Sequence, residues 1–315
     1  MLAKEAAARI KERSSSRPSY RNPDFDFQPP LDNRFSNISI TMDECGVVVG
    51  GNVRFPLIYN GNFYKRGEIP WLVVIYKLYS GALGYKYICG GTLVSHKHVI
   101  TAAHCTTRKA TQRPVNQNTL TVHLGKNNLK TSVDEVQIQF VSIICIMNEP
   151  HIYKLSRNVA ILELREPVTY TDWVRPACLW PDNETDLKNI IGKKGSVVGW
   201  RIDDTGVVNE ELGLVELPVV SQETCIRSNA EFFGVYTSEY TYCAGNRNGT
   251  SLCNGDSGGG MVFKIKGVWY IRGLLSLMLA RPNVTQCDPT HYAIFTDLAK
   301  FLPWIYYHKY IVHLI

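Results

Sequence analysis

Residues 253–260 read Cys-Asn-Gly-Asp-Ser-Gly-Gly-Gly, a short stretch in which one serine, Ser257, stands among four glycines. A serine flanked by glycines can hold its hydroxyl in a tight, exposed turn, with the amides of Gly255 and Ser257 directed at a developing oxyanion. Such a turn suits a nucleophile, although glycine-rich turns that carry a serine are also common without any chemistry. Taken alone, the stretch leaves both interpretations open.

A second stretch far upstream changes that balance. Residues 101–105 read Thr-Ala-Ala-His-Cys and supply His104 beside a cysteine. An isolated histidine among small residues is more often a satisfied core group, but with Ser257 as its partner His104 fits a general base. Together the two stretches resemble the chymotrypsin/trypsin-like serine proteases, and the resemblance covers residues 45 to about 310. It implies an all-β fold of two antiparallel six-stranded β-barrels with a C-terminal helix.

The composition describes an ordinary globular protein. The chain has 315 residues, of which 45% are hydrophobic, enough to bury one large core or two modest ones. Its formal charge of +6 is spread along the sequence, and no basic stripe interleaves with aromatic residues. We therefore expect no nucleic-acid surface; a protein substrate, a cascade protease or an inhibitor fits better as a partner.

Cysteine usage indicates an oxidising compartment. There are nine cysteines and none of the paired C-x-x-C spacings of a zinc site, so we expect no metal and no cofactor. Four Asn-x-Ser/Thr sequons, at Asn37, Asn183, Asn248 and Asn283, agree with secretion as a glycoprotein. The first twenty residues lack the apolar core of a signal peptide, and no run is long enough to span a membrane. We expect a secreted protein whose leader lies outside this sequence.

The expected organisation is a mobile pro-segment over residues 1–57 followed by a protease domain over 58–315. The first barrel should span about 58–170, the second about 171–300, and a terminal helix about 298–310, with Pro303 in its first turn. The apolar runs at 72–76, 89–95 and 98–105 are predicted as strands of the first barrel.

The resemblance also implies a disulfide pattern. The expected pairs are Cys45–Cys178, Cys89–Cys105, Cys225–Cys243 and Cys253–Cys287. Cys145 is left over in an apolar run, where it is either a small buried hydrophobe or half of an intermolecular bridge.

The acid of the expected catalytic triad is missing. In the family it precedes an aliphatic stretch of the type found at 159–164, and this chain has Asn158 at that position. An amide keeps the shape of a carboxylate, but it can force the wrong histidine tautomer and cannot balance an imidazolium. We expect a protein that folds as a protease and cleaves poorly.

The resemblance further implies activation by cleavage. A cut between Leu57 and Ile58 would free an amine that pairs with the buried carboxylate of Asp256 and orders the oxyanion loop. The residue before the cut is not basic, so an activator with apolar preference is required; a cut after Arg54 is the tryptic alternative. A third possibility is that Ile58 packs in a strand and no cut occurs.

The specificity pocket departs from the family pattern. Its floor would be Ser251 and its walls Ser276, Met278 and Ala293, with Met278 and Ala293 at positions that are usually glycine. A neutral floor provides no counter-charge for Arg or Lys. A narrow pocket for Leu, Val or Ala, or no pocket at all, is the expectation.

Two functions remain open. The first is a secreted serine endopeptidase of an extracellular cascade, made as a zymogen and weakened by Asn158. The second is an inactive homologue that binds a regulatory partner through the same cleft. The departures from the family pattern, together with the Gly-Gly-Gly after Ser257, are similar to arthropod modular and gastrulation-defective-type serine proteases.

Overall fold

The computed structural model describes residues 45–49, 67–79, 81, 84–108, 113–130, 135–147, 155, 157–200, 212–248, 252, 256–281 and 287–311. Five residues of the expected site and disulfides lie outside these ranges: Leu57, Ile58, Ser251, Cys253 and Gly255.

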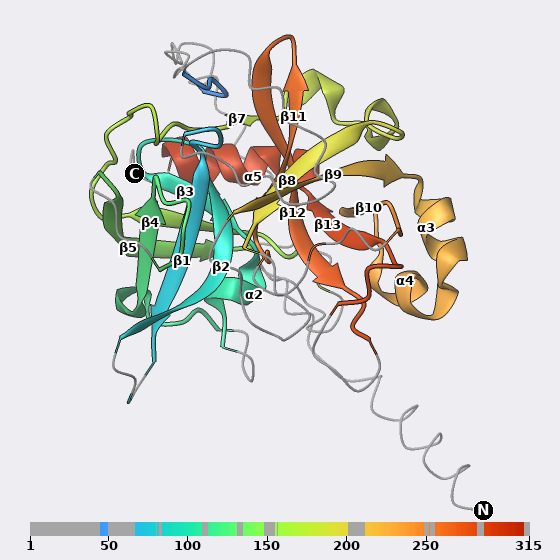
Figure 1. The fold of residues 1–315 in the computed structure, drawn as a ribbon, viewed down its shortest axis with the longest axis horizontal. Coiled ribbons are helices and arrows are strands. Elements are labelled where there is room, and N and C mark those ends of the chain that lie inside the picture. The colour runs from blue at the N-terminus through green and yellow to red at the C-terminus, as the bar shows by residue number, and fades with distance from the viewer. Residues whose placement is uncertain are drawn as a thin grey trace, which may run out of the picture. The chain divides into compact units, whose positions relative to one another are not determined.

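The first half of the described chain is a closed, antiparallel barrel (Figure 1). Its strands are β1 (Leu72–Leu78), β2 (Tyr85–Leu93), β3 (His98–Thr101), β4 (Leu120–Leu124), β5 (Gln137–Ile146) and β6 (Ala160–Leu164). They follow the order β1-β2-β3-β6-β5-β4, and β4 pairs with β1 to complete the ring.

The second half forms another barrel of six antiparallel strands. These are β8 (Lys194–Gly199), β9 (Gly213–Val220), β10 (Thr241–Ala244), β11 (Gly260–Ile265), β12 (Val268–Met278) and β13 (Ala293–Asp297). Pairing of β11 with both β8 and β12 closes this ring, and the short strand β7 (Cys178–Leu179) adds to β12 in parallel. The predicted fold class is confirmed, with β7 as the one parallel addition among the described strands.

The hydrophobic pattern of each strand explains which of its side chains are buried. In β1 the run from Leu72 to Ile75 is buried without interruption, as expected for a strand covered on both faces. In β9 the side chains of Val215, Leu217 and Val219 enter the core while the residues between them are only partly buried. That period of two is the pleat of a half-buried strand.

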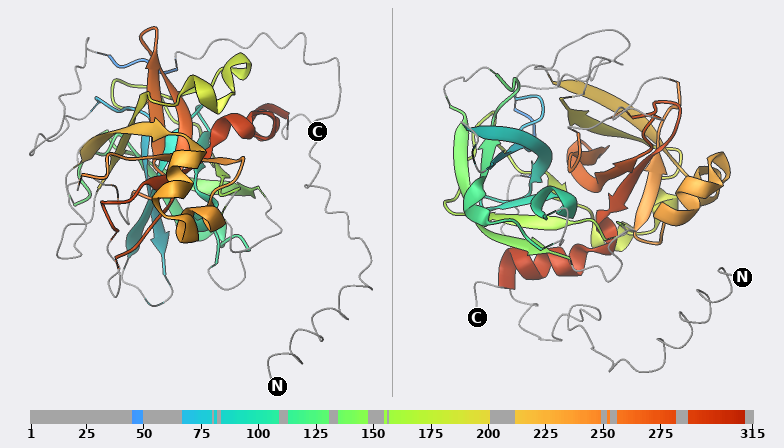
Figure 2. Two further views of the ribbon diagram at one scale, coloured as in Figure 1. Left: turned by 90° about the vertical axis from the view of Figure 1, so that its right-hand side faces the viewer. Right: turned by 90° about the horizontal axis from the view of Figure 1, so that it is seen from below.

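The helices within the described ranges are few and short. They are α2 (Ala103–Thr106), α3 (Gln222–Ser228), α4 (Ala230–Tyr236) and α5 (Leu302–Tyr306), with a 3₁₀ turn over Leu298–Lys300 before α5 and a π-helical turn over Tyr307–Ile311 after it. Pro303 lies in the first turn of α5, where a proline loses no helical hydrogen bond. Leu302 packs in the core of the second barrel, and the helix then runs along the first barrel (Figure 2).

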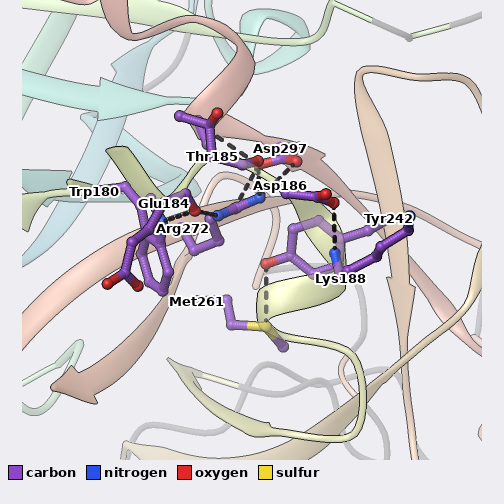
Figure 3. Close-up of polar contacts among 10 residues, drawn as sticks. Trp180, Glu184, Thr185, Asp186, Lys188, Tyr242, Met261, Arg272 and Asp297 are labelled. Atoms are coloured by element: carbon purple, nitrogen blue, oxygen red, sulfur yellow. Dashed lines mark hydrogen bonds and ion pairs between the residues drawn. The ribbon is translucent and has the colours of Figure 1, made fainter. Parts of the chain in front are cut away.

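The second barrel contains a buried ion pair whose arginine also bonds the segment between the two barrels (Figure 3). Arg272 on β12 donates from Nε and Nη2 to the two carboxylate oxygens of Asp297 at 2.7 and 3.1 Å, and both side chains are almost fully buried. Its remaining donors reach the carbonyl oxygens of Glu184 and Thr185 at 3.1 and 2.8 Å. The Trp180 ring lies 4.8 Å from the guanidinium carbon. Four hydrogen bonds and an aromatic face therefore surround the buried charge.

Three disulfides join described cysteines: Cys45–Cys178, Cys89–Cys105 and Cys225–Cys243. Cys287 is also disulfide-bonded, and its expected partner Cys253 lies outside the described residues. Cys145 is free and partly exposed on β5, and burial raises the pKa of its thiol to about 11. No described helix is long and apolar enough to cross a membrane.

Candidate active site

His104 lies on a short helix and not on the predicted strand. The ladder between β3 and β6 ends with the pair Thr101 and Ala160, where β6 begins, so the chain beyond Thr101 has no partner strand. It turns instead into α2, closed by a bond from the Cys105 N–H to the Ala102 carbonyl. The Cys89–Cys105 disulfide ties this helix to β2 beside His104. The prediction of a strand over 98–105 was therefore wrong beyond Thr101.

Ser257 is held by both barrels. Its carbonyl accepts the Gly90 N–H of β2 at 2.9 Å, and the next residue, Gly258, donates its N–H to the Leu275 carbonyl of β12 at 3.0 Å. Gly258 has a φ of +76°, and a Cβ there would collide with Thr101 Oγ1 and with the Gly90 carbonyl. Only glycine fits this turn, which explains the glycine after the serine.

Asn158 is buried and held at every polar atom of its amide. Its Oδ1 accepts the backbone N–H of His104 at 3.0 Å. Its Nδ2 lies 2.9 Å from Nδ1 of the His104 ring and donates to Ser276 Oγ at 2.8 Å. Thr296 on β13 donates its hydroxyl to the Asn158 backbone carbonyl at 3.3 Å. The first barrel thus contributes Asn158, and the second barrel contributes two hydroxyls, one that accepts from the side-chain amide and one that donates to the backbone carbonyl.

These contacts determine the histidine tautomer. The His104 backbone N–H can only donate, so it requires the oxygen of the Asn158 amide and leaves the NH₂ group facing the ring. Nδ1 of His104 must then accept, and the proton of the neutral ring lies on Nε2. Burial lowers the pKa of His104 from its usual 6.5, which favours this neutral form.

A cavity of about 310 Å³ opens between the barrels at this point. Its described walls are His104, Leu155, Ser257, Leu275, Ser276, Leu277, Met278 and Cys287. The expected pocket residues Ser276 and Met278 are among them. Ala293 is buried behind this wall, paired with Met278 across β12 and β13.

Sequence reasoning missed Leu155 and Cys287 as wall residues, whereas Leu275 and Leu277 flank the predicted wall residue Ser276. Leu155 has a φ of +47°, unusual for a side chain of its kind, and it lies three residues before Asn158. No pattern of polar residues marks these positions, because apolar wall residues carry no chemical signature in the sequence.

Asp256 is buried beside the serine. One carboxylate oxygen lies so close to Gly199 that a Cβ at that glycine would collide with it. Burial and the charge of Asp256 together hold the pKa of the Tyr87 hydroxyl well above its usual range. The proposed partner of this carboxylate after cleavage, the amine of Ile58, lies outside the described residues.

The described residues contain one cluster with metal-ligand atom types, formed by Cys89, His104 and Cys105. The two sulfurs are joined in a disulfide, so neither is a thiolate ligand. This cluster is therefore the support of His104 and not a metal centre.

Two closed barrels with His104 and Ser257 on one cavity between them are characteristic of chymotrypsin-like serine hydrolases. The family model described as Trypsin matches residues 58–305, and the chain belongs to this family of trypsin-like serine proteases. The family predicted from the sequence is confirmed.

Curated relatives include several arthropod proteins. The chain is 30% identical over 275 residues to Serine protease gd of Drosophila melanogaster, covering 76% of this chain and 50% of that protein. It is 31% identical over 261 residues to Limulus clotting factor C of Carcinoscorpius rotundicauda, covering 80% of this chain and 25% of that protein. It is 32% identical over 240 residues to Chymotrypsin-C of Bos taurus, covering 75% and 82%. The chain thus spans half or less of the length of the first two relatives.

Proposed function

We propose that this chain is the protease part of a secreted serine endopeptidase made as a zymogen, with Ser257 as nucleophile and His104 as general base. The amides of Gly255 and Ser257 would bind the oxyanion. The proposal further holds that intrinsic turnover is low, because Asn158 occupies the position of the triad acid.

His104 and Ser257 on one cavity are the observation that carries the endopeptidase proposal, and the amide contacts of Asn158 are the observation behind its low turnover. With Nδ1 accepting from the amide, Nε2 of His104 already bears a proton and cannot take the one from Ser257. The NH₂ group also cannot neutralise an imidazolium. An Asp-to-Asn exchange in a protease triad lowers turnover by about 10⁴ while leaving the geometry intact. That corresponds to about 5 to 6 kcal/mol of activation free energy.

The cavity supports a preference for apolar side chains. Most of its described walls are apolar, with Leu155, Leu277 and Met278 among them. With Ser251 as a neutral floor, an Arg or Lys side chain would lack a counter-charge. We propose cleavage after a modest apolar residue such as Leu, Val or Ala.

Activation is proposed to follow cleavage between Leu57 and Ile58. The new amine would pair with Asp256, whose buried carboxylate immediately precedes the nucleophile. A buried carboxylate is stabilised by such a partner, and the pairing would order the chain beside Ser257.

Secretion into an extracellular cascade is proposed on two grounds. Three disulfides among described residues suit an oxidising compartment. Among the relatives are proteins described as a clotting factor and as a CLIP domain-containing serine protease. We propose a protein substrate or a neighbouring protease of such a cascade as the partner.

The test compares the chain cleaved before Ile58 with its Asn158→Asp variant, using fluorophosphonate labelling and a peptide library. We expect slow labelling of Ser257 in the first and a gain of about 10³ to 10⁴ in kcat/KM in the second. Ser257→Ala in both backgrounds is the control for contaminating proteases.

If the Asn158→Asp variant neither labels nor cleaves, the endopeptidase proposal fails. The alternative, a non-catalytic homologue that binds a partner or inhibitor through this cleft, would then stand. Asn158 is the specific observation that favours it.

A further inference from the structure

The hydrogen bonds of Asn158 determine what the cleft offers to a ligand. All polar atoms of the amide are engaged: Oδ1 by the His104 N–H, and Nδ2 by His104 Nδ1 and Ser276 Oγ. No reorientation of the amide is available without placing two N–H donors against each other. His104 is therefore a neutral ring whose Nε2–H lies on the edge opposite Asn158.

The cavity wall is consequently a donor surface. His104 and Ser257 both line it, and with Nδ1 facing Asn158 the Nε2–H and the Ser257 hydroxyl are the donors that these two side chains can offer to a ligand. The described lining residues include no acidic side chain. Asp256, the residue before Ser257, places one carboxylate oxygen against Gly199 and is not among the described lining residues.

We propose that the cleft binds the α-carboxylate of a polypeptide chain end, with an apolar C-terminal side chain in the cavity and the carboxylate on His104 and Ser257. This rests on the same cleft as the proposed function but does not require turnover. A carboxylate can accept two hydrogen bonds at once. Hydrogen bonds to its charged oxygens are also stronger than hydrogen bonds to the oxygen of a neutral amide. The apolar walls at Leu155, Leu277 and Met278 suit a Leu or Val terminus.

An aspartate in place of Asn158 would remove this property in two ways. Its carboxylate would accept from Nδ1–H, so that the neutral ring would turn its Nε2 lone pair toward the ligand. It would also add a negative charge one imidazole ring away from the bound anion. Repulsion across that distance at a protein surface weakens binding by about tenfold or more.

The experiment measures the affinity of two peptides that differ only at the terminus. An N-acetylated tetrapeptide ending in Leu is used as the free acid and as the amide, by calorimetry at pH 8, which lies above the usual pKa of histidine. Both the full chain and the chain cleaved before Ile58 are titrated. We expect the acid to bind about tenfold more tightly than the amide, and this ratio to fall to one or below in Asn158→Asp.

A second readout keeps the test independent of the fold of the variant. In ¹⁵N-labelled wild-type protein, the His104 imidazole should show a protonated Nε2 and an unprotonated Nδ1. The Nε2–H resonance should shift on addition of the acid and much less with the amide.

Met278→Trp fills the cavity without touching Asn158, and should weaken both peptides while leaving the histidine tautomer unchanged. Equal affinities for acid and amide, an unchanged ratio in Asn158→Asp, or no binding of either peptide would each overturn the proposal. Fluorophosphonate labelling reports on turnover separately. Binding of the acid to the unaltered chain, without any labelling of the Asn158→Asp variant, would refute the endopeptidase and leave this site.

Discussion

Two buried polar clusters lie on the same pair of strands and differ in charge. Toward the middle of β12 and the end of β13, Arg272 and Asp297 form an ion pair with almost no exposure. Farther along β12, and one residue earlier on β13, Ser276 accepts a hydrogen bond from the neutral side-chain amide of Asn158, and Thr296 donates to the Asn158 backbone carbonyl. The second barrel buries a charge pair at Arg272 and Asp297, whereas the side chain held beside His104, at the position proposed for the triad acid, is neutral.

The difference shows what a buried charge requires. The Arg272 guanidinium has four hydrogen-bond acceptors and an aromatic face, so its desolvation is compensated. The amide of Asn158 is equally well bonded, but its NH₂ meets the histidine with a donor. Complete hydrogen bonding is therefore compatible with an unproductive protonation state.

The largest expected effect comes from removing one charge of the ion pair. Burial raises the pKa of Asp297 from its usual 3.8, and Arg272 opposes this shift. Arg272→Met should lower the free energy of unfolding by about 3 to 5 kcal/mol at pH 7, because an unpaired carboxylate stays buried. Urea denaturation measures the loss.

The matched control is the double variant Arg272→Met with Asp297→Leu, which should recover part of the stability because both charges are gone. Without Arg272 the folded-state pKa of Asp297 should rise further, because Arg272 no longer opposes the effect of burial. The loss of stability in Arg272→Met should therefore be smaller near pH 5, where the carboxyl takes up a proton. Equal instability of the single and double variants would show that the pair is not coupled.

A smaller effect is expected in the pH dependence of stability that comes from His104 beside the Asn158 amide. The folded-state pKa of His104 lies below its usual 6.5. Between these two pKa values the unfolded chain binds more protons than the folded chain. Stability contributed by neutral His104 is present above pH 6.5 and is lost as the pH falls through 6.5 toward the folded pKa.

Asn158→Asp should reverse this sign. An imidazolium paired with a carboxylate has a folded pKa above 6.5, so its stabilisation is present below 6.5 and is lost as the pH rises through the folded value. NMR titration of the His104 ring and urea midpoints from pH 5 to 8 measure both. The difference between the two backgrounds should disappear when His104→Ala is added to each; a difference that persists points to another group.

The smallest effect concerns Arg157, which precedes Asn158 and ties its loop to the second barrel. Nη2 donates to the Tyr240 hydroxyl at 3.1 Å, and the guanidinium carbon lies 4.6 Å from that ring. Arg157→Ala should lower the free energy of unfolding by about 1 kcal/mol. In the Asn158→Asp background it should also reduce kcat/KM a few-fold by loosening the loop.

Tyr240→Phe separates the two contacts with Arg157, because it removes the hydroxyl and keeps the aromatic face. It should show roughly half the loss of Arg157→Ala. A Tyr240→Phe variant as unstable as Arg157→Ala would assign the whole effect to the hydrogen bond.

Much of the fold could be predicted from the sequence, and three polar residues of the proposed site stand in recognisable local patterns. Glycine-flanked Ser257, His104 beside a cysteine, and Asn158 before an aliphatic strand are local patterns. Their physical requirements, a positive φ after the serine and a short covalent support beside the histidine, are met by neighbours in the chain. Local requirements of this kind are visible in a sequence because the residues that satisfy them are adjacent.

The tertiary structure alone decided the rest. The pairing of Arg272 with Asp297, the hydroxyls of Ser276 and Thr296 on Asn158, and the position of Leu155 in the cavity wall depend on barrel closure. The orientation of the Asn158 amide likewise depends on a backbone N–H that β3 delivers only because its ladder ends at Thr101. The sequence by itself determined which groups are present, whereas closure of the two barrels determined which donor faces which acceptor, because hydrogen bonds depend on distance and direction between segments far apart in the chain.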